Sequence, residues 1–311
     1  MKRWGLTFPL PGLPLAAQRE LAERAEAAGY TDLWSGETNG ADGFTPLALA
    51  AGWTERVRLG TGVVGVFTRG RALLAQEAAS LADASEGRFA LGIGASSDRI
   101  VEGWNGMRLE RPLSRISETI DYLRPVLAGD RAAEGGFKLE QAPAEPVPIV
   151  VAALRGKMLR LAVEKADGAF TNFLPLGSAG RVVDALEGAP EGFELLCRFF
   201  CLAGEREEVE GLARFMFSSY VTVPFYEAFF RWLGHGEAID EMVAAWAAKD
   251  RQGAAAAAPW KLIEDTFLIG PPQRIRERLD AYVEAGITLP VLTPIAPPER
   301  LGELIEALAP A

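Results

Sequence analysis

The sequence contains few of the side chains that proteins use to bind metals, form disulfides or catalyse reactions through imidazole. Its 311 residues include two cysteines and one histidine. Cys197 and Cys201 lie four residues apart in an apolar, strand-like run, which holds them too far apart to bond to each other without a bend. We therefore expect reduced core thiols in a cytoplasmic protein. Because no cluster of His, Cys and Asp residues has the spacing of metal ligands, we expect no metal site.

Long hydrophobic runs and clusters of basic residues are also absent. No apolar segment reaches roughly 18 residues, the length that a membrane-spanning helix needs. The short apolar stretch after Arg3 is interrupted by prolines, unlike a signal peptide. The formal net charge is −10, and the lysines and arginines form no patch, which disfavours nucleic acids and anionic membranes as partners. We expect a cytoplasmic protein that acts on a small molecule.

Two common sequence signatures are missing as well. No Gly-x-Gly-x-x-Gly turn occurs early in the chain, which argues against a doubly wound open sheet. No Gly-x-Ser-x-Gly elbow occurs, which disfavours hydrolysis by an activated serine. His235 lies between Gly234 and Gly236, and we expect an exposed turn residue there rather than a catalyst.

What the sequence does contain is a regular alternation of short apolar segments and amphipathic helices. The expected strands are residues 4–8, 31–35, 57–66, 89–93, 149–152, 168–173, 193–202 and 287–292. Helices are expected between nearly all of them, because the intervening segments show helical periodicity. This order predicts an α/β fold of the (β/α)8 (TIM) barrel type, in one domain spanning residues 1–311. The active sites of such barrels lie at the C-terminal ends of the strands.

A long insertion, rich in aromatic residues, is expected between the seventh and eighth strands, at residues 205–266. Most of its aromatic side chains are expected to pack its helices together. An apolar insertion at this end of a barrel is also a natural lid over the catalytic face. The side chains that we expect to line a substrate pocket come from this insertion and from the ends of strands. They are Phe67, Trp104, Phe173, Phe225, Tyr226 and Trp260.

The strand at residues 89–93 ends in a turn that is rich in glycine and serine. Gly94 lets a ligand approach the backbone, and Ser96 and Ser97 are residues that cap helices. A strand that ends in this way and opens a helix offers backbone N–H groups and hydroxyls to a phosphate or to the polar edge of a ring. A purely structural role for these residues is equally compatible with the pattern.

Several pieces of the sequence, taken in order, match a known family. They are residues 28–37, 44–48, 54–63, 84–94, 101–104, 165–169, 269–272 and 285–287. Together they resemble the bacterial luciferase-like superfamily, and within it the coenzyme F420-dependent oxidoreductases of actinobacteria. The resemblance covers most of the chain outside the insertion. It implies a TIM barrel that binds coenzyme F420, with FMN as the alternative cofactor.

The resemblance implies a cofactor ring across the mouth of the barrel, against the end of the third strand. There the family carries a bulge with a non-proline cis peptide, which in this chain falls at Gly62–Val63. Phosphate is implied at the loops after the fourth and fifth strands, where Arg155 or Lys157 supplies charge, although Lys157 equally fits a solvated helix charge. The implied cofactor-binding residues are Phe8, Glu37, Thr61, Gly62, Val63, Gly94, Ala95, Ser96, Ser97, Ala153, Leu154, Arg155, Gly156, Lys157, Thr171 and Asn172.

Glu37, at the end of the second strand, is the acidic group that we place nearest the ring, where it orients the ring or the substrate. The alternative is that it pairs with a loop amide. The sugar-phosphate dehydrogenase branch of the family has a histidine just after this acidic residue and a glutamate in the loop after the fourth strand, where this chain has Thr38 and Ser97. Ser97 is the second candidate catalytic residue, but serine is a poor general acid at neutral pH, so that branch's proton transfer is not carried over. Arg69 or Arg71 fits either an anion-binding role or a surface role.

The expected reaction is transfer of a hydride between the deazaflavin C5 and a carbonyl, imine or activated alkene of a small substrate. One alternative is an FMN-dependent monooxygenase of the same family, whose flavin reacts with oxygen. Another, of a different class, is a barrel that binds a cofactor or ligand without catalysis. The resemblance also implies a homodimer, which the sequence itself does not show.

Overall fold

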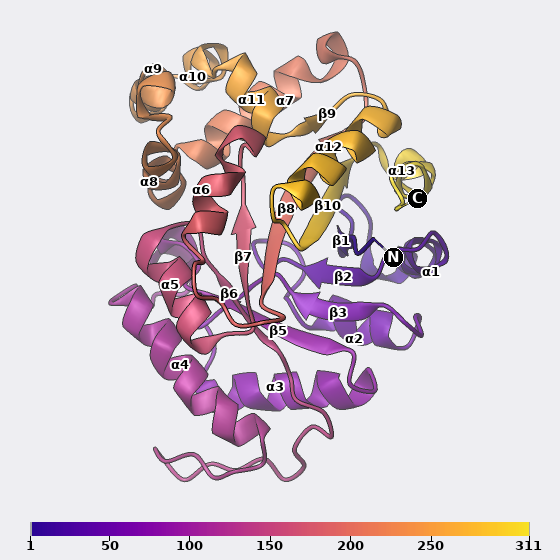
Figure 1. Ribbon diagram of the computed structural model, residues 1–311, viewed down its shortest axis with the longest axis vertical. Helices are drawn as coiled ribbons and strands as arrows, with labels where there is room; N and C mark the ends of the chain where they lie inside the picture. The colour runs from indigo at the N-terminus through magenta and orange to yellow at the C-terminus, as the bar shows by residue number, and fades with distance from the viewer. Residues whose placement is uncertain (1, 311) are drawn as a thin grey trace.

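Eight parallel strands close into a barrel in the structure, a computed structural model that describes residues 2–310 (Figure 1). The barrel closes because the last strand pairs with the first strand on one side and with β8 on the other. The barrel strands are β1 (Gly5–Thr7), β2 (Asp32–Ser35), β3 (Arg58–Thr61), β5 (Phe89–Gly94), β6 (Ile149–Ala152), β7 (Gly168–Asn172), β8 (Glu194–Leu202) and β10 (Leu289–Ile295). This confirms the predicted (β/α)8 barrel.

Helices that follow the strands form the outer layer of the molecule (Figure 1). In α3, Leu74 and Ala78 are buried while Gln76 and Ser80 are exposed, which is the amphipathic pattern of a helix packed on a sheet. The outer helices are α1 (Arg19–Ala27), α2 (Thr45–Ala51), α3 (Arg71–Ala84), α4 (Pro112–Leu127), α5 (Gly156–Lys165), α6 (Ala179–Asp184), α12 (Pro272–Glu284) and α13 (Leu301–Ala307).

The third predicted strand, residues 57–66, is interrupted in the structure. β3 ends at Thr61, and β4 (Val64–Gly65) resumes the pairing with β5 after two residues. A cis peptide joins those two residues, Gly62 and Val63, which confirms the bond that the resemblance implied. Glycine is needed at position 62 because a Cβ there would lie 2.5 Å from Cε1 of Phe170.

Inward-facing apolar side chains fill the interior of the barrel below its C-terminal mouth. Trp34 and Phe170 meet edge to face, with their ring centroids 5.4 Å apart, and Gly60 leaves the space that the Trp34 indole occupies. The other buried members of this cluster are Ala90, Val150, Leu196, Leu289 and Val291. Because alternate residues of a strand share a face, the next inward positions after Phe170 and Leu196 are Asn172 and Arg198. They face the C-terminal mouth of the barrel.

The insertion between β8 and β10 is helical and lies at the C-terminal end of the barrel strands, at the top of Figure 1. Its contacts with the end of β7 fix that position, since Phe173 stacks on Tyr220 with ring centroids 4.5 Å apart. The helices are α7 (Arg206–Val221), α8 (Pro224–Leu233), α9 (Gly236–Ala247), α10 (Arg251–Ala257) and α11 (Trp260–Thr266), and they are followed by β9 (Leu268–Ile269). β9 pairs with the end of β8 and so leads the chain back to the barrel.

Both cysteines are free and fully buried, and burial raises the pKa of each thiol. Within residues 2–310, no group of three His, Cys, Asp or Glu side chains is placed to hold a metal ion. Over the same residues, no helix is both long and apolar enough to cross a membrane.

Candidate active site

One wall of the barrel mouth, from β3 to β6, is built from residues with little or no side chain. A Cβ at Gly94 would lie 2.7 Å from Cγ2 of Val63 and 3.0 Å from Cβ of Ala152. A Cβ at Gly92 would collide with the carbonyl of Thr61. The strands therefore approach so closely here that only glycine fits. The result is a flat wall whose open face is the planar cis peptide Gly62–Val63, because the Val63 side chain covers the buried Gly92 and Gly94.

The polar groups next to this wall are used within the protein. The Thr61 hydroxyl donates to the Gly92 carbonyl (2.8 Å) and accepts from the Gly92 amide (2.7 Å), so it fixes β3 against β5. Phe8 follows β1 and is fully buried in the core. The Thr61 hydroxyl and the Phe8 ring therefore support the packing of the barrel, and their contacts with a cofactor stay predictions.

Two loops on adjacent strands form a polar rim at one side of the mouth. Ser97 Oγ accepts a hydrogen bond from the amide of Ile100 (3.3 Å) and thereby caps the short π-helix at Arg99–Trp104. On the neighbouring strand, Arg155 and Lys157 are exposed at the start of α5. Because β5 and β6 pair in parallel, both loops leave the barrel at the same edge.

The charge and backbone of this rim suit an anion. Among the described residues, neither Arg155 nor Lys157 forms an ion pair with a carboxylate, and Gly156 between them has a φ of +50°. The first-turn amides of an α-helix have no intrahelical acceptor and carry partial positive charge. The structure thus brings together the predicted group Gly94, Ala95, Ser96, Ser97, Ala153, Leu154, Arg155, Gly156 and Lys157.

Glu37 is held by an arginine that the sequence did not single out from its neighbour. Its Oε2 and Oε1 lie 2.5 Å and 2.6 Å from Nη1 and Nη2 of Arg69, and Oε1 also accepts from the amide of Gly43 (3.0 Å). Nε of Arg69 lies 3.1 Å from Oε2 of Glu77, whose pKa is raised by burial. Arg71 pairs with Glu134 instead. The loop-amide alternative for Glu37 is therefore present, together with a bidentate ion pair.

A second polar group in the mouth consists of Arg198, Asn172 and Tyr226. Nε of Arg198 donates to Oδ1 of Asn172 over a long 3.4 Å, and Nδ2 of Asn172 donates to Oη of Tyr226 at 2.7 Å. The Arg198 guanidinium lies 5.1 Å from the ring centroid of Phe200. Burial raises the pKa of Tyr226, so the phenol keeps its proton. Asn172 and Tyr226 were predicted, and Arg198 was not.

Arg198 was missed because residues 193–202 were interpreted as one apolar run. A period-two analysis would have separated Leu196, Arg198 and Phe200 from the alternate face of the strand. An arginine on the apolar inner face of a barrel strand is itself a signal. A hydroxyl pair, Thr7 and Thr293, lies on neighbouring strands of the same mouth with its oxygens 2.6 Å apart and was also not predicted.

Two of the predicted pocket residues pack against neighbouring side chains. Phe173 is 2% exposed and packs among the rings of Phe200, Tyr220, Tyr226 and Phe267, so it belongs to the core beneath the insertion. Trp260 lies against the guanidinium groups of Arg206 and Arg214 on α7. Phe173 is thus covered by its neighbours while Trp260 is partly exposed, and the pocket-lining role of both residues stays a prediction.

The remaining predicted residues divide between buried and open positions. Thr171 alternates with the inward-facing Asn172 and points away from the mouth, and its buried hydroxyl has no partner among the described residues. Phe67 is nearly buried and lies 5.9 Å from the Arg115 guanidinium. Trp104 and Phe225 are exposed, at 47% and 37%.

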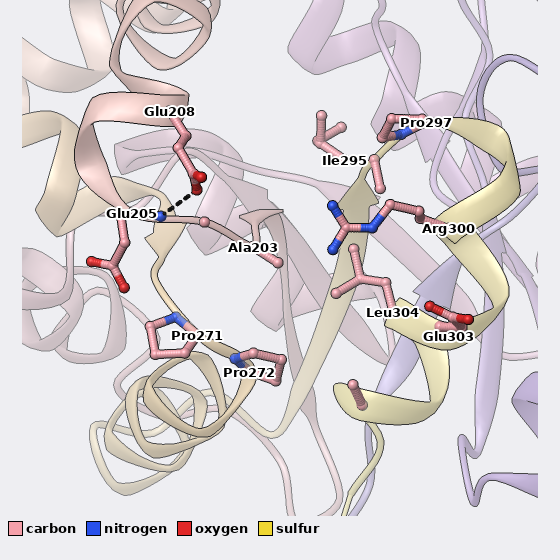
Figure 2. Close-up of a pocket in the computed structure, with 13 residues that line it drawn as sticks. Ala203, Glu205, Glu208, Pro271, Pro272, Ile295, Pro297, Arg300, Glu303 and Leu304 are labelled. Atoms are coloured by element: carbon pink, nitrogen blue, oxygen red, sulfur yellow. Dashed lines mark hydrogen bonds between the residues drawn. The ribbon is translucent and has the colours of Figure 1, made fainter.

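A surface pocket outside the mouth is a separate feature (Figure 2). It has a volume of about 460 Å³ and lies among the first residues of α7, the first residues of α12 and the segment that leads into α13. Its lining includes Glu205, Glu208, Arg300 and Glu303, and the amide of Glu205 donates to Oε2 of Glu208 at 2.9 Å. It shares no residue with the mouth described above, and its excess of carboxylates disfavours a phosphate.

Comparison with known proteins gives the fold and the family. A family model described as "Luciferase-like monooxygenase" matches residues 7–289. A Mycobacterium tuberculosis protein, provisionally named a coenzyme F420-dependent oxidoreductase, is 29% identical in an alignment of 311 positions. The alignment covers 88% of this chain and 89% of that protein.

Two solved structures have the same fold at low sequence identity. The coenzyme F420-dependent tetrahydromethanopterin reductase of Methanopyrus kandleri aligns with a TM-score of 0.78 and 20% identity over 98% of this chain and 96% of that chain. The FMN-bound oxygenating constituent of 3,6-diketocamphane monooxygenase of Pseudomonas putida aligns with a TM-score of 0.69 and 18% identity, over 99% and 97%. Since the family model spans nearly the whole barrel, the chain belongs to the luciferase-like monooxygenase family of oxidoreductases.

Proposed function

We propose that the protein is a coenzyme F420-dependent oxidoreductase that transfers a hydride between the deazaflavin and a small organic substrate. The observation that carries the proposal is the flat wall at the barrel mouth, whose open face is the cis peptide Gly62–Val63. Its shape fits a planar ring. The similarity to a relative named for coenzyme F420, along most of both chains, supports the deazaflavin over other planar cofactors.

The described residues offer partners for each part of such a cofactor. Gly62, Val63 and Gly94 would lie against the ring, while Ser96, Arg155 and Lys157 would bind the phosphate of its tail. When bound, the deazaflavin supplies the carbon that donates or accepts the hydride. The chain's own part is to hold the reactants together and exclude water, because positioning removes a large entropic barrier.

Glu37 and Ser97 have limited roles in this proposal. Arg69 fixes the Glu37 carboxylate, and the fixed carboxylate would in turn orient groups at the mouth. Ser97 caps a helix and would offer its hydroxyl to phosphate rather than transfer a proton. The substrate would carry a carbonyl, imine or activated alkene. We further propose that the protein functions as a homodimer, which sedimentation analysis would test.

An FMN-dependent monooxygenase is the second candidate, and the FMN-bound structure with the same fold favours it. Titration of the purified apoprotein with oxidised coenzyme F420 and, separately, with FMN distinguishes the two through quenching of cofactor fluorescence. Preferential binding of coenzyme F420 supports the main proposal, and preferential binding of FMN supports oxygen-dependent chemistry. Binding of neither cofactor would contradict both.

A further inference from the structure

Arg198 carries a charge that the proposed function does not use. It extends from the inner face of β8 at the mouth of the barrel and is half-buried. Among residues 2–310 no carboxylate forms an ion pair with it, and its one polar contact is the long hydrogen bond to Asn172. Taking an arginine out of water without a countercharge is unfavourable. A ligand with a negative charge would remove that cost.

The Arg198 side chain reaches across the mouth toward the flat wall. Gly36 directly follows β2, and a Cβ atom placed on it would lie 3.7 Å from Nη1 of Arg198. The carbonyl oxygen of Gly62 lies 4.0 Å from that same Cβ position. The guanidinium therefore lies beside the wall that the cofactor ring is proposed to contact, and the glycine at position 36 leaves it accessible.

Tyr226 supplies a second hydrogen-bond donor to the same place. Its Oη accepts a hydrogen bond from Asn172, so its own O–H is left to donate, and no acceptor for that proton lies among the described residues. Asn172 contacts both Arg198 and Tyr226 and so fixes their relative positions. The two side chains together present only donors, which is the pattern that recognises a carboxylate.

We infer that Arg198 and Tyr226 bind a carboxylate group of the substrate, so that the substrate is a carboxylic acid which also carries the reducible carbonyl, imine or alkene. This inference rests on the proposed function for the identity of the reacting group. The phosphate of the cofactor has separate cations on the loop after β6, namely Arg155 and Lys157. The guanidinium on β8 is therefore left for the second reactant.

The test measures binding of simple carboxylates by isothermal titration calorimetry, with and without coenzyme F420. Acetate, propionate, benzoate and cinnamate are compared with their uncharged amides. At least one carboxylate should bind wild-type protein, and its amide should bind about thirtyfold more weakly or not at all, because the amide lacks the charge. Arg198→Gln should weaken the binding of that carboxylate by about thirtyfold, and Tyr226→Phe should weaken it by about tenfold.

Two further variants control for charge and folding. Arg198→Lys keeps the charge but loses the planar fork, and it should bind with intermediate affinity. Arg274→Gln removes an exposed arginine on α12 and should bind like the wild type. Thermal melts of every variant show whether it is folded.

Carboxylate binding that Arg198→Gln leaves unchanged would overturn the inference, as would equal binding of carboxylates and amides or no binding of either. Loss of coenzyme F420 affinity in Arg198→Gln would assign the arginine to the cofactor and overturn it too. Arg198-dependent carboxylate binding in a protein that does not bind coenzyme F420 would support the carboxylate site and contradict the proposed function.

Discussion

Arg58, at the N-terminal end of the barrel, and Arg198, at its C-terminal mouth, differ in their countercharges. At the N-terminal end, Nε of Arg58 lies 2.6 Å from the fully buried Asp32 and Nη1 lies 2.8 Å from Glu194, while Arg3 contacts both carboxylates. At the C-terminal end, Arg198 has no countercharge among the described residues. Each carboxylate of the N-terminal cluster is paired with a guanidinium, although Nη2 of Arg58 has no hydrogen-bond partner among the described residues. The mouth therefore contains a positive charge that no described carboxylate of the chain neutralises.

The largest expected effect comes from breaking the N-terminal cluster. Arg58→Gln leaves Asp32 buried with only the half-exposed Arg3 as a cation, and it should lower the free energy of unfolding by about 3 kcal/mol. Urea denaturation followed by circular dichroism measures the change. Arg19→Gln, which removes an exposed helix pair, should cost only about 0.5 kcal/mol. Equal effects of the two substitutions would refute the assigned difference.

Acid should weaken the N-terminal cluster as its carboxylates become protonated. Burial alone would raise the pKa of Glu194, but Arg58 and Arg3 lower it below its usual value of 4.5. A carboxylate with a lowered pKa stabilises the fold above its unfolded-state pKa, and that stability is lost as the pH falls through the folded-state value. Unfolding free energies measured from about pH 6 to about pH 3 should therefore fall less steeply in Glu194→Gln than in the wild type. Parallel curves would contradict this.

At the mouth, removing cations should affect binding rather than stability. The double substitution Arg155→Gln and Lys157→Gln should weaken the binding of coenzyme F420 by about tenfold, because it removes positive charge beside the expected phosphate. It should also reduce the salt dependence of that binding. Fluorescence titrations at low and high salt measure both quantities. Unchanged affinity would mean that the tail binds elsewhere.

The smallest effect on stability is expected at the unpaired arginine. Arg198→Gln removes a half-buried charge that has no countercharge, so the free energy of unfolding should change by less than about 0.5 kcal/mol or should rise. Denaturation beside Arg58→Gln gives the contrast directly. A loss as large as that of Arg58→Gln would show that Arg198 supports the fold.

The barrel could be predicted from the sequence because each strand is a short apolar run and most are followed by an amphipathic helix. The interruption at Gly62–Val63 could not be found from local pattern, since residues 57–66 have the composition of one continuous strand, and only the family resemblance implied it. The Glu37–Arg69 ion pair depends on how two loops fold over one another. The alternation along β8 sets Arg198 apart in the sequence, but the closure of the barrel was needed to show that its face of the strand points inward.

We propose that the open mouth, and not the pocket of Figure 2, is the reaction site. A crystal structure of the protein with coenzyme F420 tests it most directly. We predict that the ring lies against Gly62, Val63 and Gly94, with the tail phosphate between the Ser96 loop and the start of α5. A ring bound in the pocket between α12 and α13, or anywhere outside the mouth, would contradict the account.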